Sequence, residues 1–444
     1  MVAVLTRIFG VHNLALAEDV VQEAFCRALE VWQFRGVPEN PSAWLMTTAK
    51  NLALDTLRRE RTARTFAPEL GHLLQSEWTL APVVEELFSA NALKDDLLRM
   101  MFSCCIPRLP EASQVALILH ILCGFSVGEI AGALVSTEAS TEKRITRAKK
   151  VLAKSKKLFD VTAATEFSAR LPAVQRALYL LFNEGYHGAS ADRAVQAGLC
   201  REAMRLTATL LENSLARIPS TYALASLMCF DAARLPGRVD ASGNLRSLFH
   251  QDRSNWDQEL VAEGMKLLEL STTDSGLTEY HVEAAIASIH ARALRPEDTD
   301  WAGIVALYDT LMSIHPSPVV ELNRAIAVAQ NEGPERGLEA VRSIKDVDRL
   351  AAYPFYSAAL GELELRCGRH EIAHEHFVAA RALARNPMER RFLDERVSAC
   401  EGSGEKNTGP MGNGPVPRRI EEETPGHTHA AGILQQCDNI VKLP

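Results

Sequence analysis

The stretch FSVGEIAGALVSTEASTEKRITRAKKVLAKSKK, residues 125–157, decides the fold of the first half of the chain. Ser126 followed by Glu129 is a capping-box pattern, which predicts that a short helix starts there. Residues 135–137 interrupt the helical pattern, and a second helix is predicted from Glu138, capped by one of the two hydroxyl residues in the interruption. A short helix, a tight turn and a longer helix are the layout of a helix-turn-helix motif.

The second predicted helix has two different sides. Ile145, Ala148 and Leu152 recur at helical spacing and form a stripe that faces a core. A basic helix that only faces solvent in a bundle is the alternative interpretation, but the cap, the turn and the one-sided stripe together favour DNA binding. The polar residues on the opposite side are Ser140, Lys143, Arg147 and Lys150.

The composition limits the classes of function that fit the chain. The 444 residues are enough for two to four domains, and the formal net charge of -8 excludes a general polyanion binder. The nine cysteines form no CxxC pair and have no zinc-ligand spacing with histidine, so reduced thiols and neither a metal nor a cofactor are expected. No signal peptide opens the sequence, and the longest apolar run, residues 115–125, is too short to span a bilayer. We expect a cytoplasmic protein without membrane contact.

An amphipathic helix is predicted for residues 14–32. Val21, Phe25, Ala28 and Trp32 line one of its faces, and acidic and other polar residues lie mostly on the others. Taken alone, such an acidic face is most often simply solvated.

A second informative helix is predicted for residues 41–61, with Asn40 as its cap and Pro41 at its first position. Asn51, Asp55 and Arg58 share an exposed face, where asparagine and arginine can bond base edges and phosphates. Trp44 is either a core residue or a platform on which an unpaired base stacks. The basic end of the helix also has a purely structural explanation, because cations near a helix C-terminus favour the helix dipole.

Three segments in this order and spacing, LAEDVVQEAF (16–25), PSAWLMTTAKNLALDTLRRER (41–61) and RITRAKKVL (144–152), resemble an extracytoplasmic-function sigma factor of the sigma-70 family. The resemblance implies core RNA polymerase and promoter DNA as partners. Members usually have one or two more helical turns before the position of Met1, so this sequence is expected to start late.

The resemblance also implies roles for individual residues. The first segment would dock on the beta-prime clamp helices of polymerase, the second would melt and read the minus-10 element, and the helix-turn-helix would read the minus-35 element near the beta flap. The loop at residues 34–42 would take up a flipped base. The implied polymerase-binding residues are Asp19, Gln22, Glu23 and Phe25; the implied DNA-binding residues are Trp44, Lys50, Asn51, Asp55, Arg58, Arg59, Ser140, Lys143, Arg144, Arg147 and Lys150.

The rest of the chain is predicted to be helical, so the expected fold is all-α: two small DNA-binding domains followed by an α-helical repeat extension. Gly333 and Gly368 end similar helices 35 residues apart, which is similar to tetratricopeptide repeats. Residues 183–190 and 231–256 are predicted as structural connections, the second with mutual salt bridges. The predicted divisions are 1–65 (region 2), 66–92 (linker), 93–160 (region 4), 161–300 (helical extension), 301–398 (repeats) and 399–444 (disordered tail).

The function predicted from these features is a promoter-specificity subunit of RNA polymerase. Some members of the family carry a C-terminal helical extension, and here it is expected to regulate or support activity through contact with the sigma domains, polymerase or a third protein. A one-component helix-turn-helix activator and a repeat scaffold are the alternatives, although an activator does not need a melting helix. An enzyme is the least favoured class, because the sequence has no nucleophile, metal or phosphate-loop signature.

Overall fold

Helices are the regular elements of this protein throughout the part that the computed structural model describes, which confirms the all-α prediction. The described residues are 1–9, 13–64, 95–106, 108–134, 136–154, 164–187, 195–238, 246, 248, 251–272, 276–351, 353–384 and 387–401. They divide into two compact units. The first holds Met1–Leu180 with Leu206–Arg217, and the second holds Leu181–Arg205 with the chain from Ile218 onward.

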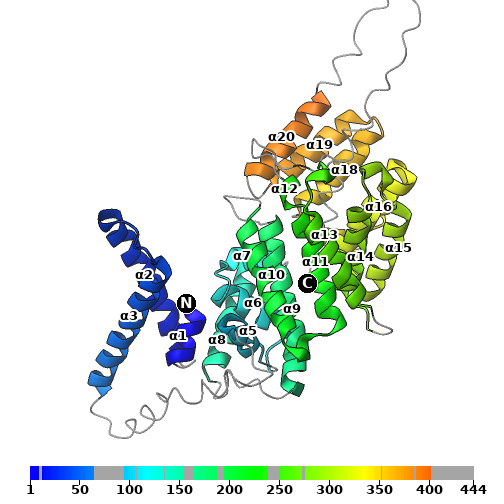
Figure 1. Cartoon of the computed structure of the whole chain (residues 1–444). Coiled ribbons are helices and arrows are strands. Elements are labelled where there is room, and N and C mark those ends of the chain that lie inside the picture. The colour runs from blue at the N-terminus through cyan, green and yellow to red at the C-terminus, as the bar shows by residue number, and fades with distance from the viewer. Residues whose placement is uncertain are drawn as a thin grey trace, which may run out of the picture. The chain divides into compact units, whose positions relative to one another are not determined.

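The first unit begins with three helices: α1 (Val2–Phe9), α2 (Leu14–Arg35) and α3 (Pro41–Arg64) (Figure 1). The predicted helices at 14–32 and 41–61 are confirmed, and each is three residues longer than predicted. Small and aliphatic residues let the helices pack closely, and the buried members of this core are Leu5, Phe9, Ala17, Val20, Val21, Ala24, Ala28, Leu45, Ala49 and Ala53. The predicted linker at 66–92 lies outside the described residues.

Four further helices of the first unit are α5 (Asp96–Cys104), α6 (Glu111–Ile121), α7 (Val127–Ala133) and α8 (Glu138–Ala153). The Asp95 carboxylate caps α5 by accepting the N–H groups of Leu97 and Leu98 at 2.8 and 3.1 Å. Residues 115–119 of α6 are all buried, so α6 is the central helix against which α5, α7 and α8 pack. This arrangement fixes the position of α8, whose outer side carries the predicted DNA contacts.

Helix α9 (Ala164–His187) starts in the first unit. The ring of Phe167 stacks on Phe102 of α5 at 4.5 Å between centroids, and Arg170 donates a hydrogen bond to the Phe102 carbonyl at 3.2 Å. The unit that contains α5 to α8 therefore continues to Leu180, whereas the sequence placed a domain boundary after residue 160.

The predicted connection at 183–190 is wrong in its first half, because α9 continues through His187. Gly185 lies in this last part of α9, where the helix packs against α10. A Cβ atom on Gly185 would lie 2.7 Å from the backbone nitrogen of Cys200, so only glycine lets α9 approach α10 this closely. Local propensity alone would have ended the helix near the glycine.

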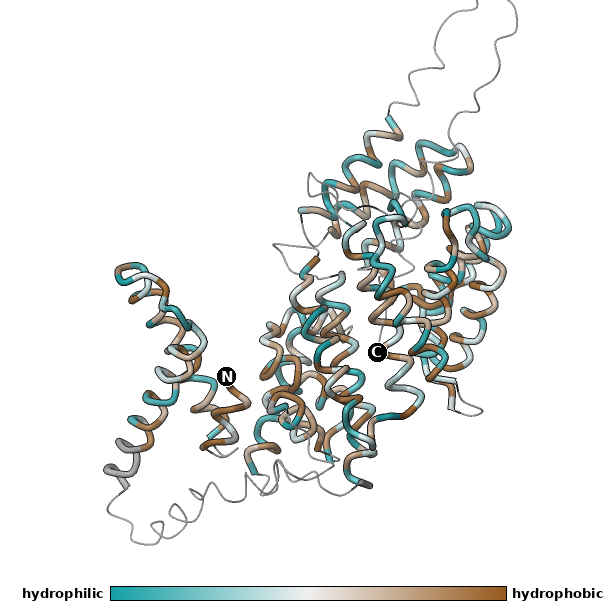
Figure 2. The backbone as a smooth tube through the Cα atoms, in the orientation of Figure 1, coloured by the Kyte–Doolittle hydropathy of each residue, from teal (hydrophilic) through white to brown (hydrophobic). Residues whose placement is uncertain are grey.

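The second unit consists of helices that follow one another in an antiparallel array (Figure 1). Figure 2 shows that hydrophobic residues gather where these helices face each other. No helix among the described residues is both long and apolar enough to cross a membrane. The helices of the second unit, in order, are the end of α9, the start of α10 (Ala197–Glu212), α11 (Pro219–Ala233), α12 (Leu235–Arg238), α13 (Gln258–Leu270), α14 (Glu279–Arg292), α15 (Trp301–Ile314), α16 (Pro318–Glu332), α17 (Pro334–Arg342), α18 (Pro354–Arg366), α19 (His370–Ala382) and α20 (Pro387–Glu401).

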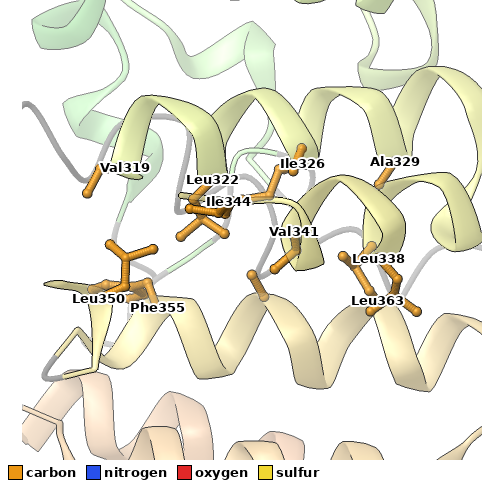
Figure 3. Close-up of a cluster of buried hydrophobic side chains, with 12 residues drawn as sticks. Val319, Leu322, Ile326, Ala329, Leu338, Val341, Ile344, Leu350, Phe355 and Leu363 are labelled. Carbon is orange, nitrogen blue, oxygen red and sulfur yellow. The ribbon is translucent and has the colours of Figure 1, made fainter. Parts of the chain in front are cut away.

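The repeat-like pattern has a structural counterpart in α16 to α19. Pro318 and Pro354 start α16 and α18, and Pro334 and His370 start α17 and α19, so both offsets are 36 residues. Figure 3 shows how side chains from α16, α17 and α18 fill one core. Helix α20 extends to Glu401, three residues into the predicted tail, and residues 402–444 lie outside the described part.

Candidate nucleic-acid interface

The helix-turn-helix forms as the sequence predicts. The Ser126 hydroxyl accepts the Glu129 N–H at 3.2 Å, and the Glu129 carboxylate accepts the Ser126 N–H at 2.8 Å, which is the complete capping box. At the start of α8 the Thr137 hydroxyl accepts the Ser140 N–H at 3.3 Å. A hydrogen bond of 2.7 Å joins the hydroxyls of Ser136 and Thr141. The turn between α7 and α8 is thus held by side chains at both helix starts.

The two sides of α8 also agree with the sequence. Thr141, Ile145, Ala148 and Leu152 are buried. Ser140, Lys143, Arg147 and Lys150 are exposed, whereas Arg144 is only half exposed and lies at the edge of this face. None of the exposed basic residues makes an ion pair with another described residue, so their charges remain available to a polyanion. We call these four exposed residues the α8 outer face.

The polar residues predicted on α2 are at its surface. Asp19, Gln22 and Glu23 are exposed, and Glu23 forms an i,i+4 ion pair of 3.1 Å with Arg27. Phe25, which lines the same face of the helix as the buried Val21 and Ala28, is itself 46% exposed. An exposed phenylalanine beside three polar residues gives this face both apolar and polar contacts for a protein partner.

The residues predicted on α3 differ in their exposure. Lys50, Asn51 and Asp55 are exposed. Trp44 is half-buried and makes an edge-to-face contact with Trp32 at 5.5 Å, so much of its indole belongs to the core of α1 to α3. Arg58 and Arg59 lie within α3, but their side chains are outside the described part.

The connection between α2 and α3 is the other exposed feature. Gly36 has a φ of 75°, which ends α2, and the Asn40 side chain accepts the Ala43 N–H at 2.9 Å, which confirms the predicted cap of α3. Phe34 and Val37 are 88% and 66% exposed. The sequence had identified the loop but neither of these side chains. A phenylalanine two residues before a helix-ending glycine is the signal that could have found the first of them.

Within the described residues no group of three or more histidine, cysteine, aspartate or glutamate side chains is arranged to hold a metal ion. Cys104 and Cys105, adjacent in sequence, are both buried, and burial raises the pKa of each thiol above its usual value.

Comparison with known proteins agrees with this geometry. Residues 1–63 match Sigma-70 region 2, residues 99–152 match Sigma-70, region 4, and residues 170–272 match a family of unknown function, DUF6596. An uncharacterized protein of Rhizobium meliloti (strain 1021) is 39% identical over 384 residues, which covers 86% of this chain and 89% of that protein. No solved structure gave a significant match.

Two relatives from Mycobacterium tuberculosis have descriptive names. A probable ECF RNA polymerase sigma factor, SigI, is 24% identical over 186 residues, which is 42% of this chain and 59% of that protein. The ECF RNA polymerase sigma factor SigJ is 32% identical over 165 residues, which is 34% of this chain and 46% of that protein. The matched regions define a protein of the sigma-70 type with both promoter-binding regions. The chain belongs to the extracytoplasmic-function sigma factors of that family.

Proposed function

We propose that the chain binds core RNA polymerase, directs it to promoters with particular minus-10 and minus-35 elements, and promotes initiation of transcription. The observation that carries this proposal is the α8 outer face: exposed basic residues that pair with no described acidic residue, on a helix whose opposite side is buried and whose start is capped. A recognition helix must be held firmly in place, and its basic side chains must be free to contact duplex DNA. Both features support this role for α8.

The residues of α2 and α3 receive complementary roles. Asp19, Gln22, Glu23 and Phe25 of α2 bind the beta-prime clamp helices of polymerase. Lys50, Asn51 and Asp55, with Arg58 and Arg59 further along α3, contact the minus-10 element. The exposed Phe34 and Val37 offer apolar surface to an unstacked base. Trp44 stabilises this surface by packing, since its ring already contacts that of Trp32.

The α8 outer face reads the minus-35 element, with Arg144 at its edge, while the region 4 domain meets the beta flap. The chemistry of RNA synthesis belongs to polymerase, and we assign no catalytic residue to this chain. Its place of action is the cytoplasm, where polymerase meets the chromosome. The second unit, with its tetratricopeptide-like pairs, regulates or supports activity through contact with the sigma domains or polymerase.

Run-off transcription with core RNA polymerase, with and without the full chain, on fragments of the source genome tests this function. Initiation at defined sites that depends on added protein is the expected result, and it supplies the promoter sequence. Binding to duplex DNA without initiation would instead indicate a one-component activator. If the chain neither binds DNA nor supports initiation, it is a repeat scaffold and the proposal is wrong.

A further inference from the structure

Three arginine side chains are buried in the second unit, near the ends of α11 and α12, two helices that Figure 1 labels. Arg234 follows α11, Arg238 ends α12, and Arg253 starts the short 3-10 helix Arg253–Asn255. Their exposed fractions are 3%, 7% and 7%. Arginine is almost never buried to this extent unless a partner compensates its charge.

Aromatic rings supply part of that compensation. The guanidinium carbons of Arg234 and Arg253 lie 5.5 and 5.3 Å from the centroid of the Trp256 ring, and that of Arg238 lies 4.0 Å from the ring of Tyr186. Such contacts stabilise a desolvated cation, but a ring carries no net charge and cannot neutralise one. The two arginines at Trp256 also repel each other.

Arg253 has a clear structural role. One of its terminal nitrogens donates hydrogen bonds to the carbonyls of His290 and Ala293 at 3.0 and 2.6 Å, and the other donates to the Thr299 hydroxyl at 3.3 Å. These bonds fasten the 3-10 helix to the end of α14. Its Nε has no hydrogen-bond partner among the described residues.

Arg234 is far less satisfied. Its contacts within the described chain are the Trp256 ring and an ion pair with Asp231 at 3.8 Å, which is too long for a hydrogen bond. Its Nε lacks a hydrogen-bond partner in the same part of the chain, and so does the indole Nε1 of Trp256. Two guanidinium groups and the indole at this one ring thus each have an N–H donor that no acceptor among the described residues satisfies.

The buried groups of the cluster carry an excess of positive charge, and the exposed Glu297 and Asp298 oppose it at Arg253. Between residues 181 and 300 of the described chain, the buried acidic residues are Asp231 and Glu184, against three buried arginines. Burial raises the pKa of Asp231 to about 6, so its carboxylate holds its charge less firmly than an exposed one. Burial, together with Arg234 and Arg253, lowers the pKa of His290 well below its usual value, so its imidazole is neutral at pH 7.

We propose that this cluster binds a small oxyanion, the phosphate or carboxylate group of a metabolite, through Arg234 and the indole N–H of Trp256. An oxyanion offers the acceptors that the orphan donors lack and the negative charge that the arginines need. Guanidinium groups match phosphate and carboxylate geometry with paired hydrogen bonds. The cluster lies in the part of the chain that matches the family of unknown function, and the proposal gives that part a ligand in addition to the transcription function.

Binding is tested on the full chain without polymerase, so its outcome is independent of the proposed sigma function. Calorimetric titration and thermal unfolding are measured with inorganic phosphate and, separately, with succinate, against potassium chloride of equal ionic strength. Saturable binding and a rise in the unfolding midpoint are expected with at least one anion beyond the chloride control. Which anion acts shows whether phosphate or carboxylate is preferred.

Arg234→Gln is expected to abolish the response, whereas Arg295→Gln removes the same charge from an exposed residue of the same unit and should leave it intact. If Arg234→Gln does not fold, Trp256→Phe keeps the ring and deletes the N–H, and we expect roughly tenfold weaker binding. The proposal is overturned if neither anion differs from chloride, or if binding is unchanged in Arg234→Gln or, where that variant does not fold, in Trp256→Phe.

Discussion

Replacing Lys143 and Arg147 together by alanine should weaken promoter binding and make it less sensitive to salt. Both side chains are exposed on the α8 outer face and form no ion pair with a described residue, so each can neutralise a DNA phosphate. Each phosphate contact contributes about 0.9 to the slope of log affinity against log salt concentration. The double substitution should therefore reduce the magnitude of that slope by about 1.8.

This change in slope corresponds to a large effect over an ordinary salt range. A fourfold rise in salt lowers affinity by about 3.5-fold per contact, and thus by about 12-fold for the two contacts together. The ratio of the promoter affinity of the unsubstituted chain to that of the variant should fall by about 12-fold over this fourfold rise in salt. Fluorescence anisotropy of a labelled promoter fragment with the reconstituted holoenzyme, across a salt series, measures both slopes.

A matched control removes the same kinds of charge elsewhere. Lys266 and Arg349 are exposed residues of the second unit, and their double replacement by alanine should leave the slope unchanged. Both double variants should unfold at the same temperature as the parent chain, because no buried contact is lost. An unaltered slope in Lys143→Ala/Arg147→Ala, or an equal reduction in the control, would refute the assignment of α8 to phosphate contact.

Five further outcomes are expected. Ser126→Ala removes the capping box and should lower the free energy of unfolding by about 1 kcal/mol in chemical denaturation. Phe167→Ala removes a buried stacked ring and should cost about 3–5 kcal/mol in the same measurement. The exposed Phe34→Ala should leave stability unchanged but reduce promoter opening, measured by permanganate reactivity of unpaired thymines. Gly337→Val should lower the unfolding midpoint, because a Cβ there would lie 2.3 Å from the Ala329 Cβ. Burial raises the pKa of Glu362 from 4.5 to about 7, so the folded state binds the extra proton and stability falls as pH rises through that window. Glu362→Gln should make the free energy of unfolding depend less on pH in a series of chemical denaturations between pH 4.5 and about 7.

The helix-turn-helix could be predicted closely because its signals are local. Capping residues such as Ser126 act on backbone groups two or three positions away, and the stripe of Ile145, Ala148 and Leu152 follows directly from helical spacing. The same reasoning found α2 and α3, although it ended both helices three residues early; α2 continues to Arg35, directly before Gly36 with its φ of 75°.

Features that depend on tertiary contacts were harder to predict from the sequence. Helical spacing puts Phe25 on the same face as Val21 and Ala28, yet the core of α1 to α3 is filled without it and 46% of its surface is exposed. Helix α9 continues through Gly185, where it lies close to Cys200, and no local pattern reveals that contact. The arginines of residues 231–256 were expected to form ordinary salt bridges, because charged residues in a polar stretch usually face solvent. Their burial becomes evident only when Trp256 and α14 are in place.

These contacts also determine how the role of the second unit should be tested. A chain ended at residue 160 would lose Phe167 and leave Phe102 uncovered, so a loss of activity would report damage to the DNA-reading unit. A chain ended at Arg217 keeps that contact but strips the end of α9 of the packing around Tyr186. Neither truncation isolates the extension. Substitutions inside the second unit of the full chain, such as Gly337→Val among the repeats or Arg234→Gln at the buried arginines, leave the first unit's own contacts unchanged. A change in promoter-dependent transcription with either variant would then be attributable to the extension itself.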